Sequence, residues 1–202
     1  MNDTKEVVLY FEEDTKFNTV DVAKELLSRY NELGNPMLLP ENSKNKNVPL
    51  ILFNTNPSFQ IQITSTSLSF LIDHTYFDKI SSIIFDMVDT FEDVKCKFVR
   101  MGIVTTTYLA PKTVEAVKKK YLVADNLPDI SNFNLSWYRE IENKYGKLNC
   151  WERIINDTQD FKDLLIQFDI NSKKEEKIDF NMKYIKEFIK ISESIVEDRT
   201  NL

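Results

Sequence analysis

"KFVRMGIVTTTYLA", residues 97–110, is the stretch with the clearest pattern of a β-strand. It consists mainly of β-branched and other apolar residues, which favour strands, with Arg100 and Gly102 near its middle. The two-residue period of a strand predicts one face with Phe98, Arg100, Gly102 and Val104, and another with Val99, Met101, Ile103 and Thr105. The second face is apolar and is expected to lie against helices. Arg100 is therefore predicted to lie on the opposite face, beside the bare glycine.

The pairing of Arg100 with Gly102 has two interpretations at this stage. In the first, Arg100 lies on a solvated face, stacks its aliphatic stem on neighbouring strands and pairs with a carboxylate. In the second it belongs to an anion or partner-contact site, because a guanidinium suits bidentate recognition of a carboxylate or phosphate. The space over Gly102 would then admit a ligand, another backbone or a bulky side chain.

The flanking sequence predicts alternating strands and helices. Before residue 97, we expect strands at 6–11, 48–54, 58–65 and 66–73, and amphipathic helices at 18–34 and 76–91. After it, we expect a short helix at 111–121, a three-stranded antiparallel meander at 135–143, 147–157 and 161–172, and a final amphipathic helix from about 180 to 197. A helix over 136–145 is the alternative for the first meander strand.

This order of elements predicts an α+β fold with mostly antiparallel sheets, each packed by amphipathic helices. The polar stretch at 123–134 is predicted to be a linker between an N-terminal subdomain, 1–122, and a C-terminal meander plus helix, 135–202. Both parts read as strands followed by a helix, so a degenerate duplication is an open interpretation.

Composition narrows the class of protein. With 202 residues, 42% of them hydrophobic, the chain can bury a substantial core. It has no apolar run of about 18 residues and no basic segment at its start, so a cytoplasmic location without a membrane partner is expected. Cys96 and Cys150 are accordingly expected to be reduced thiols.

Several kinds of chemistry lack their usual residues. The net charge of -6 argues against nucleic-acid binding, which needs concentrated Lys and Arg. The three glycines are isolated, so no phosphate-binding or dinucleotide fingerprint is present, and we expect no cofactor. The single histidine, His74, is interpreted as the start of a helix, and no metal site is predicted.

The C-terminal part holds the other candidate contact residues. Asp169 alternates with Ile166, Phe168 and Ile170, so it is predicted to face away from them. There it could pair with Arg100 or Arg139 across the sheet, or cap the following loop. Trp137 and Arg139 belong to the residue types that dominate protein interfaces. Whether the two tryptophans form core or contact surface stays open here.

A resemblance to a known family joins these features. A long amphipathic helix followed by "KFVRMGIVTTTYL", together with "LLIQFDINS" and a terminal helix, resembles a sporadically distributed, uncharacterised family of prokaryotic proteins. That family has an Arg-Ile-Gly-Leu-Arg-Tyr-Ile-Asn strand and a closing Asp-containing strand. This chain lacks the second arginine and has Thr105, Thr106 and Thr107 where the family has Tyr-Ile-Asn. The resemblance implies an α+β fold but no activity.

The function expected from the sequence is that of a non-enzymatic protein-interaction module, whose partner is another protein or a second copy of the chain. The chain is rich in Lys, Asn and Ile and has only three Gly, a composition typical of genes in AT-rich DNA. Together with the resemblance, this suggests a protein of a bacterium or mobile element, with a role in phage defence or counter-defence. The alternative is a domain that binds a small anionic ligand, or an atypical enzyme, with a pocket near Arg100 and Asp169. The tentative contact residues are Arg100, Gly102, Asp169, Trp137 and Arg139.

Overall fold

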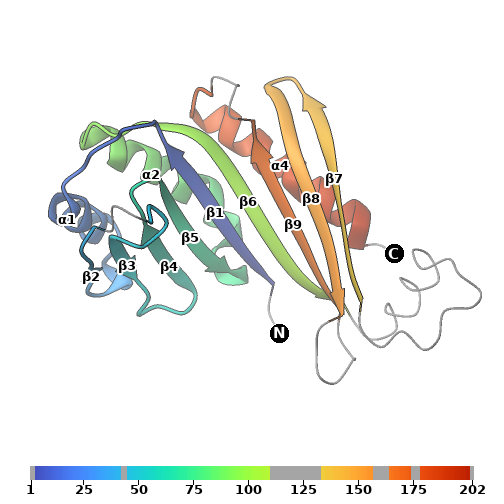
Figure 1. Ribbon diagram of the computed structural model, residues 1–202, viewed down its shortest axis with the longest axis horizontal. Coiled ribbons are helices and arrows are strands. Elements are labelled where there is room, and N and C mark those ends of the chain that lie inside the picture. Colours follow the sequence, from blue (N-terminus) through green and yellow to red (C-terminus); the bar gives the residue numbers. More distant parts are fainter. Residues whose placement is uncertain (1–2, 42–44, 110–132, 157–163, 174–177, 201–202) are drawn as a thin grey trace, which may run out of the picture.

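The computed structural model describes residues 3–41, 45–109, 133–156, 164–173 and 178–200. Its strands form one antiparallel sheet of nine strands in the order β2-β3-β4-β5-β1-β6-β9-β8-β7 (Figure 1). The predicted α+β class is confirmed, in the form of one sheet with three helices packed against it. The strands are β1 (Thr4–Phe11), β2 (Met37–Leu38), β3 (Ile51–Phe53), β4 (Phe59–Ile63), β5 (Ser67–Asp73), β6 (Phe98–Leu109), β7 (Phe133–Asn143), β8 (Gly146–Asn156) and β9 (Leu164–Ser172).

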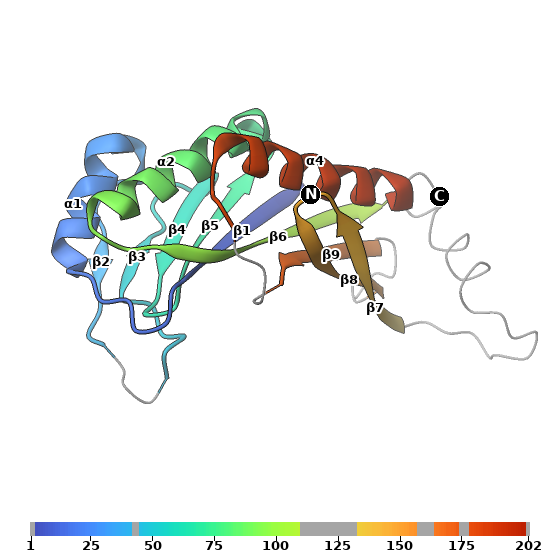
Figure 2. The ribbon, with the colours of Figure 1, turned by 90° about the horizontal axis from the view of Figure 1, so that it is seen from above.

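Helices α1 (Thr19–Arg29), α2 (Ile80–Asp93) and α4 (Met182–Thr200) lie on the same side of this sheet (Figure 2). Two of them begin at asparagine caps, which satisfy amide groups that a first helical turn leaves unpaired. The Asn18 side chain accepts from the backbone N–H of Val20 at 2.9 Å, and the Asn181 side chain accepts from that of Tyr184 at 2.9 Å. None of the described helices has the length and apolarity needed to cross a membrane.

Alternation along the strands produces one core. Buried and half-buried residues alternate without a break in β1, β4 and β5, and the buried set faces the helices. Phe59, Phe70 and Phe168 are among the largest side chains that this core removes from water. Burial of apolar area on this scale is the main stabilising term of the fold. The opposite face, which we call the open face, carries none of the described helices.

Strand β6 joins the two ends of the chain. It pairs with β1 from Thr4↔Thr106 onward and with β9 from Gly102↔Asn171 to Leu109↔Leu164. The strands of the predicted C-terminal part therefore continue the sheet of the N-terminal part. The division at 123–134 stays a prediction, because those residues lie outside the described part of the chain except for the first residues of β7.

A β-bulge changes the facing of the first residues of β6. Tyr10 lies opposite Arg100, but the next residue, Phe11, lies opposite Phe98, which leaves Val99 as the extra residue. Phe98 consequently turns to the helix side and stacks on Phe11 with ring centroids 4.9 Å apart. The prediction that Phe98 shares the face of Arg100, with Val99 on the helix side, is wrong because of this bulge.

The predicted C-terminal meander is confirmed. β7 and β8 form a hairpin that closes at Asn143↔Gly146, and β9 pairs with β8. Gly146 has φ of 118°, a conformation that side-chain-bearing residues rarely adopt, which explains glycine at this turn. The alternative helix over 136–145 is wrong. The final helix is confirmed as α4, whereas the helix predicted over 111–121 lies outside the described residues.

Candidate functional site

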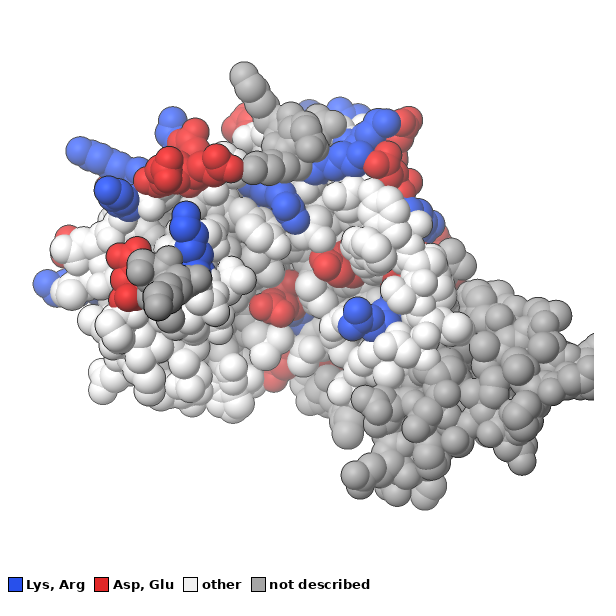
Figure 3. All heavy atoms as spheres, in the orientation of Figure 1, with Lys and Arg blue, Asp and Glu red and all other residues white. Residues whose placement is uncertain are grey.

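The open face carries three of the five predicted contact residues. Arg100, Gly102 and Asp169 all lie on it, since their neighbours Met101, Ile103 and Ile170 are buried on the helix side. Figure 3 shows this face largely uncharged, with a few acidic and basic side chains near its centre and charged clusters along one rim. The predicted facing of Arg100 beside Gly102 is therefore confirmed, and their functional role stays a prediction.

An amide side chain fills the space over Gly102. A Cβ atom placed on Gly102 would lie 2.1 Å from Oδ1 of Asn171, its partner on β9. Asn171 is buried, and its Nδ2 donates a hydrogen bond to Asp169. The space over Gly102 was expected to admit a ligand, another backbone or a bulky side chain, and in the structure the side chain of Asn171 occupies it. The glycine permits Asn171 to orient the carboxylate of Asp169.

Arg100 lies over an aromatic ring. Its guanidinium carbon is 4.4 Å from the centroid of Tyr10, a cation–π contact within the open face. Its Nε is buried and has no hydrogen-bond partner among the described residues. The positive charge is close enough to Asp169 to oppose the rise in the pKa of that carboxyl, although no ion pair of the described residues joins them.

Two half-buried carboxylates occupy the middle of the open face. Glu6 and Asp169 lie on either side of Val104, in one row of cross-strand neighbours. Burial raises the pKa of Glu6; the hydrogen bond from Ser69 opposes this rise and the charge of Asp169 adds to it. Burial also raises the pKa of Asp169, against the effects of Asn171 and Arg100. Both acids have thus lost part of their hydration, and a nearby cation would stabilise their charged forms.

The same row continues into an exposed aromatic pair. Trp151 lies opposite Asp169, and Tyr138 lies opposite Trp151. Their ring centroids are 5.0 Å apart, and the two residues are 50% and 44% exposed, which is unusual for rings of this size. Beside them is a shallow hollow of about 330 Å³, lined by Ser136, Trp151, Arg153, Gln167 and Asp169. We call the row Glu6, Val104, Asp169, Trp151 and Tyr138 the central row.

The other two predicted contact residues lie on the opposite side of the sheet. Arg139 and Trp137 both contact Glu152, which is only 1% exposed. Nε of Arg139 is 2.8 Å from Oε1 of Glu152, an ion pair without the alignment of a hydrogen bond, and the Trp137 indole donates to Oε2 at 2.8 Å. The expectation that Arg139 could pair with Asp169 is wrong, because the pleat places them on different faces.

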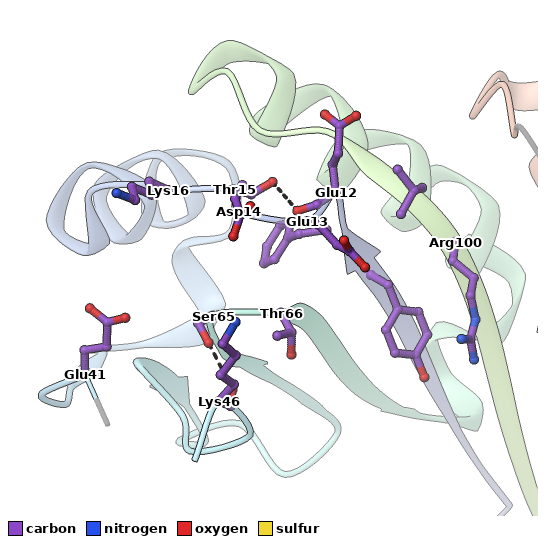
Figure 4. A pocket seen from close by; sticks show the side chains of 13 residues that line it. Glu12, Glu13, Asp14, Thr15, Lys16, Glu41, Lys46, Ser65, Thr66 and Arg100 are labelled. Carbon is purple, nitrogen blue, oxygen red and sulfur yellow. Dashed lines mark hydrogen bonds between the residues drawn. The ribbon is translucent and has the colours of Figure 1, made fainter. Parts of the chain in front are cut away.

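A second hollow lies at the end of β1. It has a volume of about 540 Å³, and its lining includes Glu12, Glu13 and Asp14 as well as Lys46 and part of Arg100. Figure 4 shows the acidic residues on the loop after β1, while the guanidinium of Arg100 extends along β6 away from Glu12. The charged side chains of its lining are of both signs, with Glu41 and Lys16 as the remaining two, so the hollow offers no net positive field to an anion.

The cysteines are not part of either hollow. Cys96 and Cys150 are buried and unbridged, and burial raises the pKa of both thiols. Since the thiolate is the reactive form, these residues act as small core side chains at neutral pH. His74 is exposed at the start of a 3₁₀ turn that Asp73 caps, as predicted.

Comparison of the chain with known protein families and with curated proteins finds no match. The resemblance described above stays a prediction, and the candidate site is defined by its geometry alone.

Sequence reasoning missed Glu6, Tyr10, Asn171 and the exposed position of Trp151 as parts of this face. A signal for Glu6 was present, since it is the only acid within the alternating run of β1. The pairing of Trp151 with Tyr138 had no such signal, because it depends on the register between β7 and β8.

Proposed function

We propose that this chain is a non-catalytic binding protein that recognises another protein through the open face of its sheet. The central row is the observation that carries this proposal. It places the half-buried Asp169 directly beside an exposed Trp–Tyr pair, with the half-buried Glu6 on the other side of Val104 in the same row. Aromatic residues at the centre of a contact surface commonly provide much of the binding energy in protein complexes.

The charges of the central row define the chemistry of the partner. Glu6 and Asp169 each have a raised pKa, so their ionised forms gain from an added positive charge. A Lys or Arg side chain placed over Val104 would lie between the two carboxylates, and its stem would contact Trp151. We therefore infer that the partner presents a basic side chain flanked by apolar groups. The net charge of -6 would attract such a partner over a longer range.

Selection from a random peptide library tests this function. We expect the immobilised protein to enrich peptides that carry a Lys or Arg beside apolar residues. The charge-removing variants Glu6→Gln and Asp169→Asn should each weaken the selected peptides at least ~10-fold, since hydrogen bonds to charged groups contribute ~1.5–3 kcal/mol. Trp151→Ala should weaken them as well.

The matched control removes an acid elsewhere. Glu92→Gln takes one negative charge from an exposed position of α2, on the helix side. Peptides that bind this variant and the open-face variants equally well would contradict the proposed site, and so would a library without any enrichment of basic residues.

A small anionic ligand is the second candidate, supported by the buried Nε of Arg100 that has no hydrogen-bond partner among the described residues. The nearby acids Glu6 and Asp169 oppose anion binding, which makes this the weaker hypothesis. Thermal-shift measurements with inorganic phosphate and nucleotides test it. A stabilising shift that Arg100→Ala abolishes, with the fold intact by circular dichroism, would favour the ligand over a basic protein partner.

A further inference from the structure

The two edges of the sheet differ in length. At one edge, β2 has two residues. At the other, β7 has 11 residues, and β8 is its only strand neighbour within the described chain (Figure 1). A strand of this length extends about 36 Å at ~3.3 Å per residue. Long unpaired edges offer backbone groups to a further strand, and natural sheets usually shorten or block them.

The ladder geometry determines which backbone groups of β7 point outward. In an antiparallel pair, alternate residues bond to one neighbour and the residues between them point to the other side. Because the hairpin closes at Asn143↔Gly146 around a two-residue turn, the odd-numbered residues of β7 are those that bond to β8. The N–H and C=O groups available to another strand are therefore those of Asn134, Ser136, Tyr138, Glu140 and Glu142.

Apolar side chains along the same edge are only partly covered. Leu135, Trp137 and Ile141 lie on the helix side of β7, packed against the core but half-exposed. At this edge of the sheet, the apolar core is therefore only partly covered. A strand added to β7 would extend the sheet and cover this row.

We propose that β7 pairs with β7 of a second copy of this chain, antiparallel, with Tyr138 opposite Tyr138 on the two-fold axis. The result is a dimer with one continuous sheet and with the described helices α1, α2 and α4 of both copies on the same side. A two-fold interface of this kind needs a strand that is complementary to itself. The register of β7 centred on Tyr138 meets this condition.

In that register, each side of the sheet has compatible pairs. On the helix side, Leu135 lies opposite Ile141 and Trp137 opposite Arg139, so apolar meets apolar and a guanidinium meets an indole. On the open side, Ser136 lies opposite Glu140. A shift by one residue in each strand toward the C-terminus puts Arg139 opposite Arg139, and the reverse shift puts Leu135 opposite Arg139. Like charges directly opposite one another disfavour the first shift, and an apolar side chain opposite a guanidinium makes the second less complementary than the Tyr138-centred register.

Charge variants at Ser136 test both the dimer and its register. Sedimentation equilibrium of the full chain should give about twice the monomer mass of 23.8 kDa. Ser136→Glu places a second acid opposite Glu140 at two symmetry-related positions and should raise the dimer Kd about 2- to 30-fold. Ser136→Lys should lower the Kd by a similar factor. These opposite effects cannot both arise from damage to the fold. Ser82→Glu and Ser82→Lys, at an exposed position of α2, are the matched controls and should leave the Kd unchanged.

Cross-linking tests the same register without a change of charge. Tyr138→Cys should form a disulfide-linked dimer under mild oxidation, since paired strands bring these Cα atoms to ~5.5 Å. Glu142→Cys should not, because its expected neighbour is Asn134. A chain that stays monomeric at ~200 µM would overturn the proposal. A dimer whose Kd ignores the charge at position 136, or one that cross-links equally through position 142, would also overturn it. The peptide selection uses the unaltered chain and the variants of Glu6, Asp169 and Trp151, none of which lies on β7, so it tests the proposed function separately.

Discussion

The helix side and the open face of this sheet come from the same strands but differ in chemistry. On the helix side, Val7, Leu9 and Phe168 belong to a continuous apolar core, and the buried Glu152 has Arg139 and Trp137 as partners. On the open face, Glu6 and Asp169 are half-buried and have raised pKa values. The comparison shows that buried charge has close partners on one face, while on the other the burial of two carboxyls is only partly compensated.

The largest expected difference between the faces is in packing. Phe168→Ala removes a ring that is 1% exposed and should lower the free energy of unfolding by ~3–5 kcal/mol, because it leaves a cavity in the core. Its neighbour Gln167 points to the open face, and Gln167→Ala should change stability by no more than ~0.5 kcal/mol. Urea unfolding measures both values. Equal losses in the two variants would contradict the two-sided description.

A smaller effect is expected from the buried ion pair. Arg139→Ala leaves the carboxylate of Glu152 without its cation, and the expected loss is ~2–3 kcal/mol. This is below the ~3–5 kcal/mol typical of fully buried pairs, because Arg139 is itself 39% exposed. Arg153→Ala, on the open face of the next strand, is the control and should be nearly neutral in urea unfolding. A neutral Arg139→Ala would show that the other partners of Glu152, among them the Trp137 indole and the Cys150 thiol, satisfy the carboxylate.

A substitution at Gly102 tests the close contact between the backbone of β6 and the side chain of Asn171 on the open face. Gly102→Ala should cost ~1–2 kcal/mol, since the new Cβ forces the Asn171 amide to move from its position beside Asp169. The double variant Gly102→Ala with Asn171→Ala should show smaller combined losses than the sum of the single ones in a thermodynamic cycle. If the losses of unfolding free energy in the two single variants simply added up in the double variant, the cost of Gly102→Ala would not come from its contact with Asn171.

The acids of the open face should produce the smallest effect, and one with a definite sign. A carboxyl whose pKa is raised on folding binds more protons in the folded state, so stability falls as pH rises through the interval above its ordinary pKa. For Glu6 and Asp169 this interval begins near their ordinary values of 4.5 and 3.8. Glu6→Gln should remove part of that fall and raise stability at pH 7 by less than ~1 kcal/mol after solvent screening. Thermal unfolding from pH 4 to pH 7 measures it, and a variant less stable at pH 7 would contradict the predicted sign.

Much of the sheet could be predicted because alternation is a local property. Runs such as "FQIQI" and "SLSFLID" identify strands and their buried faces without knowledge of any partner. The final helix is equally clear from its apolar spacing. The facing of Arg100 also followed from this pattern, because Met101 and Ile103 are apolar on the other side.

Relations between strands were not predictable in the same way. The bulge at Val99 depends on how β6 matches β1, and it reversed the facing of Phe98. Arg139 was one of two candidate partners for Asp169, although the neighbouring Leu135 and Ile141 indicate the helix side. The register between β7 and β8, which places Glu152 opposite Trp137, shows that Arg139 lies on the helix side. Register brings residues together across the sheet, and a single strand does not specify it.

The position of β6 between β1 and β9 affects how the chain folds during synthesis. β1 is available early as a partner, but β9 lies more than 50 residues beyond the end of β6. At a translation rate of ~5–20 residues per second, β9 is synthesised several seconds after β6, and until then the edge of β6 that pairs with β9 has no partner. During this interval an apolar strand is open to mispairing, so closing the β6–β9 ladder should be a late and slow step of folding.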